Sequence, residues 1–301
     1  MLKMHHIIMI SLIVGFSLII IGFINILLAV IFMLISDLIW LIFIWRYKDF
    51  EISMIEITNS YVILSSVYVF ILSSLIRVPS IIFFLFPLEK ASIFILSSGL
   101  LIVEGQQLEK FGFSLVKLDI QLVLGFLWGF FIAVLPTIMY FLLMFLYAGT
   151  VILIKVDIIY FLITFPFYLA VGLGEEALFR AYIERRAVIT MGYKKGIIWA
   201  AILFGLWHAY WHMLPFDFFN MLFHVFFSFM FGILFGIIYE NTNSMIIIIL
   251  IHAIWDTVVS VTTFPVVTMT EISMYILSMI ISFVMIFLAS IFLSKKIGKI
   301  I

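Results

Sequence analysis

The chain has 301 residues, of which 66% are hydrophobic and only 11% are charged. Soluble domains are roughly 45–50% apolar and about 25% charged, so a soluble fold of this length is excluded. The net charge is zero, which indicates no nucleic-acid partner, and cysteine is absent, which excludes disulfides, thiolate catalysis and cysteine-bound zinc.

Apolar segments long enough to cross a membrane follow one another along the chain. A spanning helix needs about 20 apolar residues, and the first apolar stretch, Ile7 to Trp45, is too long for a signal-peptide core and fits two spans. Residues 79–88 contain two prolines and could instead be a re-entrant or interfacial piece. The sequence predicts an all-α, polytopic membrane bundle of about ten helices, at approximately residues 7–24, 27–45, 60–76, 91–103, 120–147, 157–173, 196–213, 219–239, 245–264 and 272–294.

The basic residues predict an orientation for this bundle. With the N-terminus in the cytoplasm, ten spans place 13 of the 16 lysines and arginines on the cytoplasmic side. Arg77, Lys90 and Lys155 then lie outside. This asymmetry is the one that the positive-inside rule requires, so we expect a multi-pass protein of the cell membrane with both termini in the cytoplasm.

Two polar segments, residues 104–119 and 174–195, interrupt the apolar sequence. The first is interpreted as a linker with a short interfacial helix. We therefore predict two parts, an N-terminal transmembrane extension at residues 1–104 and a core at residues 105–301.

The second polar segment contains a pair of glutamates in the sequence GLGEEALFRAYIERR. On a helix Glu176 and Arg180 lie four residues apart on one face, in the favourable order for an ion pair, and this leaves Glu175 without a cation. A carboxylate in a partly dry site is suited to act as a general base. The alternative is a polar helix start at the membrane surface, where glutamate is favoured by the helix dipole.

Three histidines lie on or beside the next two predicted spans. His208 is about twelve residues into its span and therefore deep in the hydrocarbon, where a hydrogen-bonded structural role is the alternative to a functional one. His212 follows four residues later and could share a metal with His208, although its position near Pro215 favours a solvated role. His224 begins the following span and is interpreted as structural.

The ninth predicted span carries a histidine and an aspartate. His252 and Asp256 are four residues apart and project from one face. Such a pair could join helices as polar contacts in the membrane. It could also be a histidine oriented by a carboxylate, or two ligands of one metal ion.

Three motifs together resemble a known family. Glu175 to Arg180 (EEALFR) is similar to its EExxxR signature, Phe204 to His208 (FGLWH) to its FxxxH, and His252 to Asp256 (HAIWD) to its HxxxN or HxxxD. In this order and on hydrophobic segments, they resemble the CPBP intramembrane proteases, also called the Abi or type II CAAX-processing endopeptidases. The resemblance covers about residues 105–264.

This resemblance implies an active site within the membrane core that hydrolyses peptide bonds. Glu175 and His208 would activate water, His252 and Asp256 would stabilise the oxyanion, and Glu176 and Arg180 complete the catalytic motif. A metalloprotease form would bind Zn²⁺ through Glu175, His208, His252 and Asp256. The expected partners are membrane lipid and a membrane-associated or lipidated peptide, such as a CAAX-type protein or a peptide precursor. The alternative is a non-catalytic bacteriocin-immunity or scaffold protein that binds hydrophobic peptides.

Two features conflict with this resemblance. Residue 256 is Asp where many relatives have Asn, and an ionised Asp cannot donate a hydrogen bond to an oxyanion. Straight helices would also leave His208 roughly 10 Å deeper than Glu175, a gap that a kink at Gly172 and Gly174 or a later start of span seven would have to close. Ala181 replaces a common Gly and is expected to be tolerated on a helix.

Overall fold

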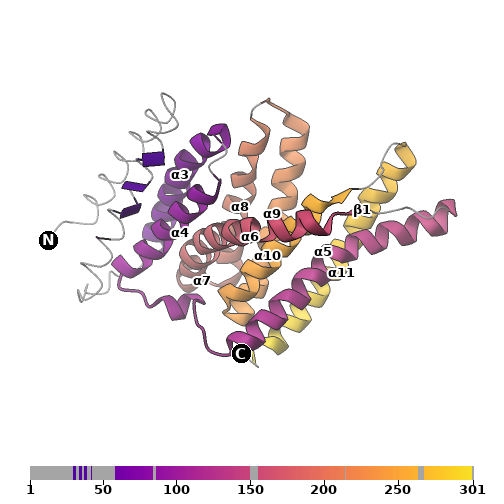
Figure 1. The fold of residues 1–301 in the computed structure, drawn as a ribbon. Helices are drawn as coiled ribbons and strands as arrows, with labels where there is room; N and C mark the ends of the chain where they lie inside the picture. Colours follow the sequence, from indigo (N-terminus) through magenta and orange to yellow (C-terminus); the bar gives the residue numbers. More distant parts are fainter. Residues whose placement is uncertain are drawn as a thin grey trace. The chain divides into compact units, whose positions relative to one another are not determined.

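The structure is a computed structural model. It describes residues 58–299 except 84–85, 150–154, 214 and 264–267, together with scattered residues between 30 and 42. In this part of the chain the fold is all-α, as predicted, apart from a two-residue antiparallel pairing of β1 (Lys155–Val156) with β2 (Thr262–Thr263). The helices, labelled as in Figure 1, are α3 (Asn59–Phe83), α4 (Phe86–Val103), the 3-10 helix η1 (Leu108–Phe111), α5 (Leu118–Ala148), α6 (Ile158–Glu176), the π-helix η2 (Ala177–Glu184), α7 (Arg185–Met191), α8 (Tyr193–Trp207), the 3-10 helix η3 (His208–His212), α9 (Phe218–Thr242), α10 (Met245–Val261) and α11 (Met269–Ile297).

Most of the predicted spans correspond to helices of the structure. The first span and nearly all of the second lie outside the described residues, and the other eight each fall on a helix. Of the segment with two prolines, residues 79–83 continue α3 and residues 86–88 begin α4. Five apolar helices of the described part are long enough to cross a membrane, so this is an integral membrane protein, while the count of ten and the orientation stay predictions. The five are Asn59–Arg77, Leu118–Tyr147, Ile158–Met191, Phe218–Thr242 and Met269–Ile297.

The chain divides into two compact units, each made of two separate stretches of sequence. The first unit combines residues 1–111 with residues 173–236, and the second combines residues 112–172 with residues 237–301. The predicted division into an N-terminal extension at residues 1–104 and a core at residues 105–301 stays a prediction.

In the first unit, α3 and α4 lie side by side (Figure 1), and α4 and α8 both pack against η2. Backbones approach closely at the glycines of this unit. A Cβ atom on Gly174 would lie 2.6 Å from the carbonyl oxygen of Lys90, and one on Gly232 would lie 2.9 Å from the Cα of Ala201. Small residues of this kind allow membrane helices to approach closely. Because lipid is as apolar as the side chains, van der Waals contacts between the helices then supply much of the attraction.

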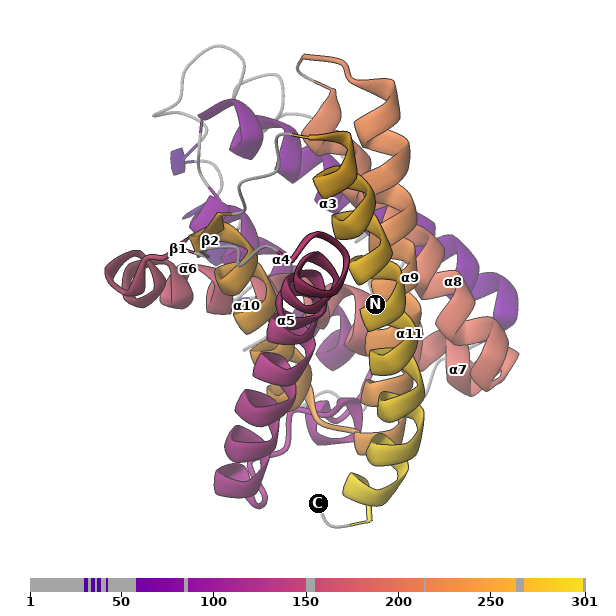
Figure 2. The ribbon, with the colours of Figure 1, turned by 90° about the vertical axis from the view of Figure 1, so that its right-hand side faces the viewer.

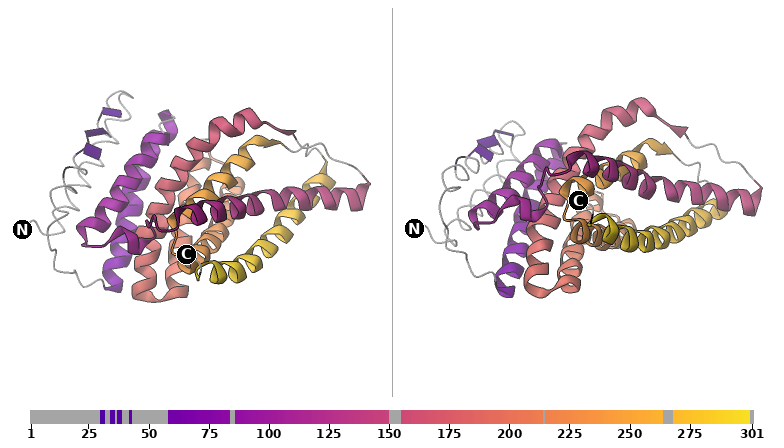
Figure 3. Two further views of the ribbon diagram at one scale, coloured as in Figure 1. Left: turned by 60° about the horizontal axis from the view of Figure 1, so that its bottom comes forward. Right: turned by 90° about the horizontal axis from the view of Figure 1, so that it is seen from below.

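In the second unit, α5 packs against both α10 and α11, and these three helices lie together in the views of Figures 2 and 3. Gly125 and Gly129 face α10, where added Cβ atoms would lie 2.7 Å from the Cδ1 atoms of Leu250 and Ile254. The buried face of α11 repeats every four residues and is mostly serine, at Ser278, Ser282, Ile286, Ser290 and Ser294.

Candidate functional site

The glutamate pair lies in the middle of one continuous helix. α6, η2 and α7 follow one another without a break from Ile158 to Met191, and Glu175 and Glu176 are the last residues of α6. The alternative of a polar helix start is therefore wrong. The next eight residues, Ala177–Glu184, are all buried and adopt the π-helical i→i+5 pattern. Such segments are rare and are frequent at functional sites.

Arg180 is the centre of a fully buried ion triad. Its Nε donates to Glu176 at 2.8 Å, which confirms the predicted pair, and its NH1 donates to Glu184 at 2.7 Å. The same NH1 also donates to the carbonyl oxygen of Gly232 at 2.9 Å. Glu184 was not predicted, although its position four residues after Arg180 is a signal that could have found it. The triad fixes η2 against α9.

Glu175 is buried and accepts hydrogen bonds from three helices. Its Oε1 receives Lys90 Nζ at 2.7 Å, Trp207 Nε1 at 3.0 Å and Arg77 NH1 at 3.2 Å. The prediction that Glu175 has no cation is therefore wrong. Lys90 also contacts Glu89 at 2.7 Å. No local pattern predicts these contacts, because Arg77 and Lys90 are 98 and 85 residues from Glu175 along the chain.

These contacts also correct the predicted depths. Arg77 and Lys90 were placed on the outer side and Glu175 near the inner side, yet all three share one buried cluster. The expected gap between Glu175 and His208 closes because the helix continues past Glu176 to Met191, turns, and returns as the 15-residue α8. Gly192 makes this turn with a φ of 86°, which favours glycine.

His208 follows Trp207 directly and starts η3. Its Nδ1 lies 2.8 Å from the carbonyl oxygen of Phe204, which can only accept a hydrogen bond. Nδ1 therefore carries the proton, and Nε2 has the lone pair needed by a base or a metal ligand. Glu175 and Arg77 are close enough to interact with His208 electrostatically. The first unit thus brings together the first two predicted motifs.

The other two histidines of this region pair with each other. His212 Nε2 lies 3.0 Å from His224 Nδ1, and the His224 ring centroid lies 5.0 Å from that of His208. His212 and His224 are both partly exposed, in keeping with the solvated role predicted for His212. In the structure His212 contacts His224, and the possibility that His208 and His212 share a metal stays untested.

His252 and Asp256 form the predicted pair in α10 of the second unit. His252 Nε2 lies 3.4 Å from Asp256 Oδ2, and the aspartate is the more exposed of the two. Gly172 faces this helix, where an added Cβ would lie 3.5 Å from the Cβ of His252. That the pair meets Glu175 and His208 at one site stays a prediction.

The charges around Glu175 bear on whether it could bind a metal ion. Two cations already bind its Oε1, and they would repel a divalent ion there. Among the described residues, no group of three or more His, Asp or Glu side chains is arranged to hold a metal. The surroundings of Glu175 Oε1 therefore do not favour a metal ion at that atom, while the predicted Zn²⁺ site, whose four ligands are divided between the two units, stays a prediction.

A second buried charge cluster in the first unit was also missed. Glu104 Oε1 accepts hydrogen bonds from Arg186 NH2 at 2.9 Å, Tyr61 at 3.0 Å and Tyr182 at 3.2 Å. Burial raises the pKa of the Glu104 carboxyl above its usual value, and the Arg186 guanidinium acts in the opposite direction. This cluster joins the end of α4 to α3, η2 and α7.

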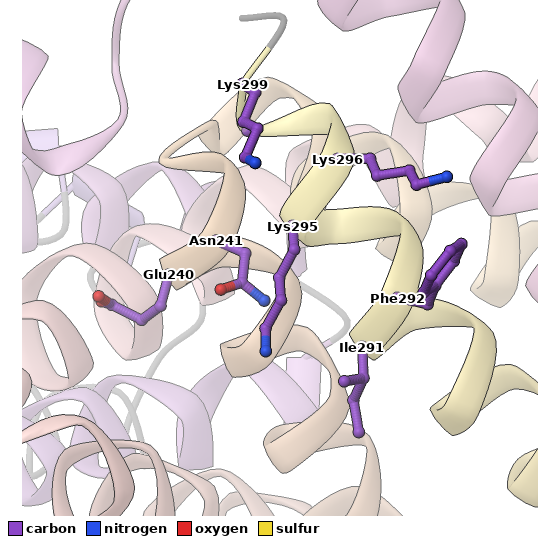
Figure 4. Close-up of a pocket in the computed structure, with 8 residues that line it drawn as sticks. Glu240, Asn241, Ile291, Phe292, Lys295, Lys296 and Lys299 are labelled. Atoms are coloured by element: carbon purple, nitrogen blue, oxygen red, sulfur yellow. The ribbon is translucent and has the colours of Figure 1, made fainter.

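A cavity of about 600 Å³ lies in the second unit near the end of α11. Figure 4 shows Lys295 extending beside Asn241, whereas Lys296 points away toward Phe292, 4.4 Å from its ring centroid. None of the residues predicted to carry chemistry lines this cavity. Basic residues at the end of a membrane helix are typical of its cytoplasmic end.

Comparison with known proteins gives one family match. Residues 157–258 match the model of a family described as type II CAAX prenyl endopeptidase Rce1-like. The chain carries an Rce1-like domain. This confirms the resemblance predicted from the three motifs, all of which lie inside the matched segment.

The Rce1-like match supports CAAX-type endopeptidase activity in general and identifies neither a substrate nor a catalytic residue. Arg77, Lys90 and Glu104 lie outside the Rce1-like domain. No curated protein and no solved structure matches the chain.

Proposed function

We propose that this protein is an intramembrane endopeptidase that hydrolyses a peptide bond of a membrane-associated, prenylated or otherwise lipidated peptide. The observation that carries the proposal is the position of Glu175 in a buried polar cluster beside His208, on the EExxxR and FxxxH motifs of an Rce1-like domain. Amide hydrolysis needs a base for water, a stabiliser for the oxyanion and a proton for the leaving amine.

The chain supplies a residue for each of these steps. His208 Nε2 accepts one hydrogen of the attacking water and so positions it, because Nδ1 is held by Phe204. Glu175 takes the other proton as the water oxygen bonds to the carbonyl carbon, and later passes that proton to the leaving nitrogen. His252 and Asp256 act on the carbonyl side, with the carboxylate orienting the imidazole.

Glu176 and Arg180 act indirectly in this proposal. Their ion pair, extended to Glu184, is fully buried and lies in the π-helix directly after Glu175. It fixes the direction in which Glu175 leaves the helix. A catalytic group must be held within a fraction of an ångström to be effective, which explains the use of three buried charges for this purpose.

The test is cleavage of a lipidated, fluorescence-quenched peptide by purified protein in vesicles. We expect Glu175→Gln and His208→Ala each to lower kcat at least 100-fold, with Glu109→Gln, an exposed carboxylate of η1, as the matched control. Retention of wild-type cleavage by both variants would exclude the proposed chemistry. A scaffold protein would instead bind the peptide without cleaving it and would be unaffected by Glu175→Gln.

Metal dependence is tested on the same preparation. Because Lys90 and Arg77 bind Glu175, we expect less than one tenth of an equivalent of zinc per chain and unchanged cleavage in the presence of EDTA. One equivalent of zinc, lost together with activity on chelation, would restore the metalloprotease alternative with Glu175, His208, His252 and Asp256 as ligands.

A further inference from the structure

Two cations from helices outside the Rce1-like domain reach the candidate base. Arg77 comes from α3 and Lys90 from α4, and both are almost completely buried. With Glu89 and Glu175 they form a cluster of two positive and two negative groups, joined by four contacts of 2.7–3.5 Å. Buried charges are costly unless they are paired, and in a membrane protein ionisable groups at depth indicate function by default.

The cations of this cluster have donors to spare. An ammonium has three N–H bonds, and within the part of the chain that the structure describes Lys90 uses two of them, on Glu89 and Glu175. Arg77 uses NH1 on Glu175, while its Nε is buried without a hydrogen-bond partner among the described residues. Close packing also holds Lys90 in place. A Cβ atom added to Gly174 would lie only 2.6–3.0 Å from the O, Cα and Cβ atoms of Lys90. A rigid, dry cation with an unused donor is suited to bind an oxyanion.

Charge movement during hydrolysis makes this position effective. When water attacks, its proton neutralises Glu175 and the carbonyl π electrons become a negative charge on oxygen. The cluster alone would then change from a net charge of zero to one positive charge. The new oxyanion restores neutrality if it lies beside the same cations, so the negative charge moves a short distance within one preorganised field.

We propose that Lys90, assisted by Arg77, is a further catalytic residue that donates a hydrogen bond to the oxyanion of the tetrahedral intermediate. This inference rests on the proposed function. It supplies the donor that Asp256 cannot provide while ionised, and it gives α3 and α4 a direct part in a reaction whose motifs lie on other helices.

The first experiment uses variants that keep the cluster neutral. Lys90→Met alone would leave a carboxylate unpaired, so it is combined with Glu89→Gln, which removes one charge of each sign. We expect the double variant to lower kcat by 100–1,000-fold with little change in KM, since loss of one oxyanion donor has an effect of about this size. Glu109→Gln, an exposed carboxylate of η1 outside the cluster, is the control and keeps wild-type activity. Lys90→Arg, which retains the cation, keeps cleavage within about tenfold of wild type.

The second experiment needs no variant. A phosphinic peptide has an anionic tetrahedral group like the intermediate, whereas a hydroxyethylene peptide of the same side chains is neutral. We expect wild-type protein to bind the phosphinic peptide at least 100-fold more tightly. The double variant, where it folds, loses this preference but keeps its affinity for the neutral peptide.

The outcomes separate this inference from the proposed function. Cleavage that depends on Glu175 but survives with wild-type kcat in the double variant overturns the role of Lys90 alone. Equal affinities of the two inhibitors for wild-type protein overturn it as well. A wild-type protein that cleaves no lipidated peptide, or whose cleavage is unchanged by Glu175→Gln, overturns the proposed function itself.

Discussion

Both units pack their helices closely at glycines, but the first also buries paired charges, whereas α11 of the second buries a face made mostly of serine. In the first, three arginines and a lysine are almost inaccessible and each contacts at least one glutamate; they are Arg77, Lys90, Arg180 and Arg186. In the second, α5 meets α10 through Gly125 and Gly129, and α11 presents a serine face. Both units are helical and apolar outside, so the difference lies in what holds their helices together.

The two kinds of contact differ in how sensitive they are to substitution. A buried ion pair is costly to break, because the remaining partner keeps its charge in a dry place. Close packing around small residues fails more gradually, since a neighbouring side chain can move. Hydrogen bonds between membrane helices contribute least, averaging about 0.6 kcal/mol each. We therefore expect substitutions in the first unit to have the larger effects on stability.

The largest effect is expected at Arg180. Its replacement in Arg180→Met leaves Glu176 and Glu184 buried without their cation and should destabilise the protein by about 3–5 kcal/mol. Unfolding in mixed detergent measures this, with the exposed Lys194→Met as control. Adding Glu176→Gln and Glu184→Gln should recover stability by removing the stranded charges. Wild-type stability in Arg180→Met would contradict the importance of charge in the first unit.

The second largest effect is expected at Glu104. Glu104→Gln keeps an oxygen that can accept from Tyr61 and Tyr182, but it removes the charge opposite the fully buried Arg186. We expect a loss of about 2–3 kcal/mol in the same unfolding assay, the size of a hydrogen bond to a charged group. Glu109→Gln, at an exposed position of η1, provides the comparison and should be neutral.

A smaller effect is expected at the glycine contacts of the second unit. In Gly129→Val the new side chain meets Ile254 and Ile251 of α10, where even a Cβ would lie 2.7–3.2 Å from their atoms. Overpacking of this kind costs about 1–3 kcal/mol. Leu127→Val introduces the same residue at an exposed position of α5 and should change little. An undisturbed Gly129→Val protein would show that α5 and α10 are not held by close packing.

The smallest effect is expected on the serine face of α11. Ser290 accepts a hydrogen bond from Trp128 Nε1 at 3.3 Å, and Ser290→Ala should cost only about 0.6 kcal/mol. Ser273→Ala, an exposed serine that bonds to its own helix, is the matched control. If Ser290→Ala were more damaging than Arg180→Met, the contrast between the two units would be reversed.

Local information in the sequence was enough for several features. The apolar segments predicted eight helices that the structure contains, because a membrane helix satisfies its own backbone hydrogen bonds and needs only a long apolar stretch. The pairs Glu176 with Arg180 and His252 with Asp256 followed from four-residue spacing alone. The order of three short motifs was enough to predict the family that the Rce1-like match then confirmed.

Other features depend on which helices meet and could not be predicted before the helix packing was known. Lys90 and Arg77 reach Glu175 across 85 and 98 residues, and no periodicity within one helix indicates such a contact. The expected gap between Glu175 and His208 was wrong because the helix of Glu175 continues to Met191 before the chain turns back. The amino-acid sequence was therefore enough to predict that the protein lies in a membrane and which residues pair within one helix. The cations around the candidate base depend on helix packing, because charges far apart along the chain can pair only where helices bring them together.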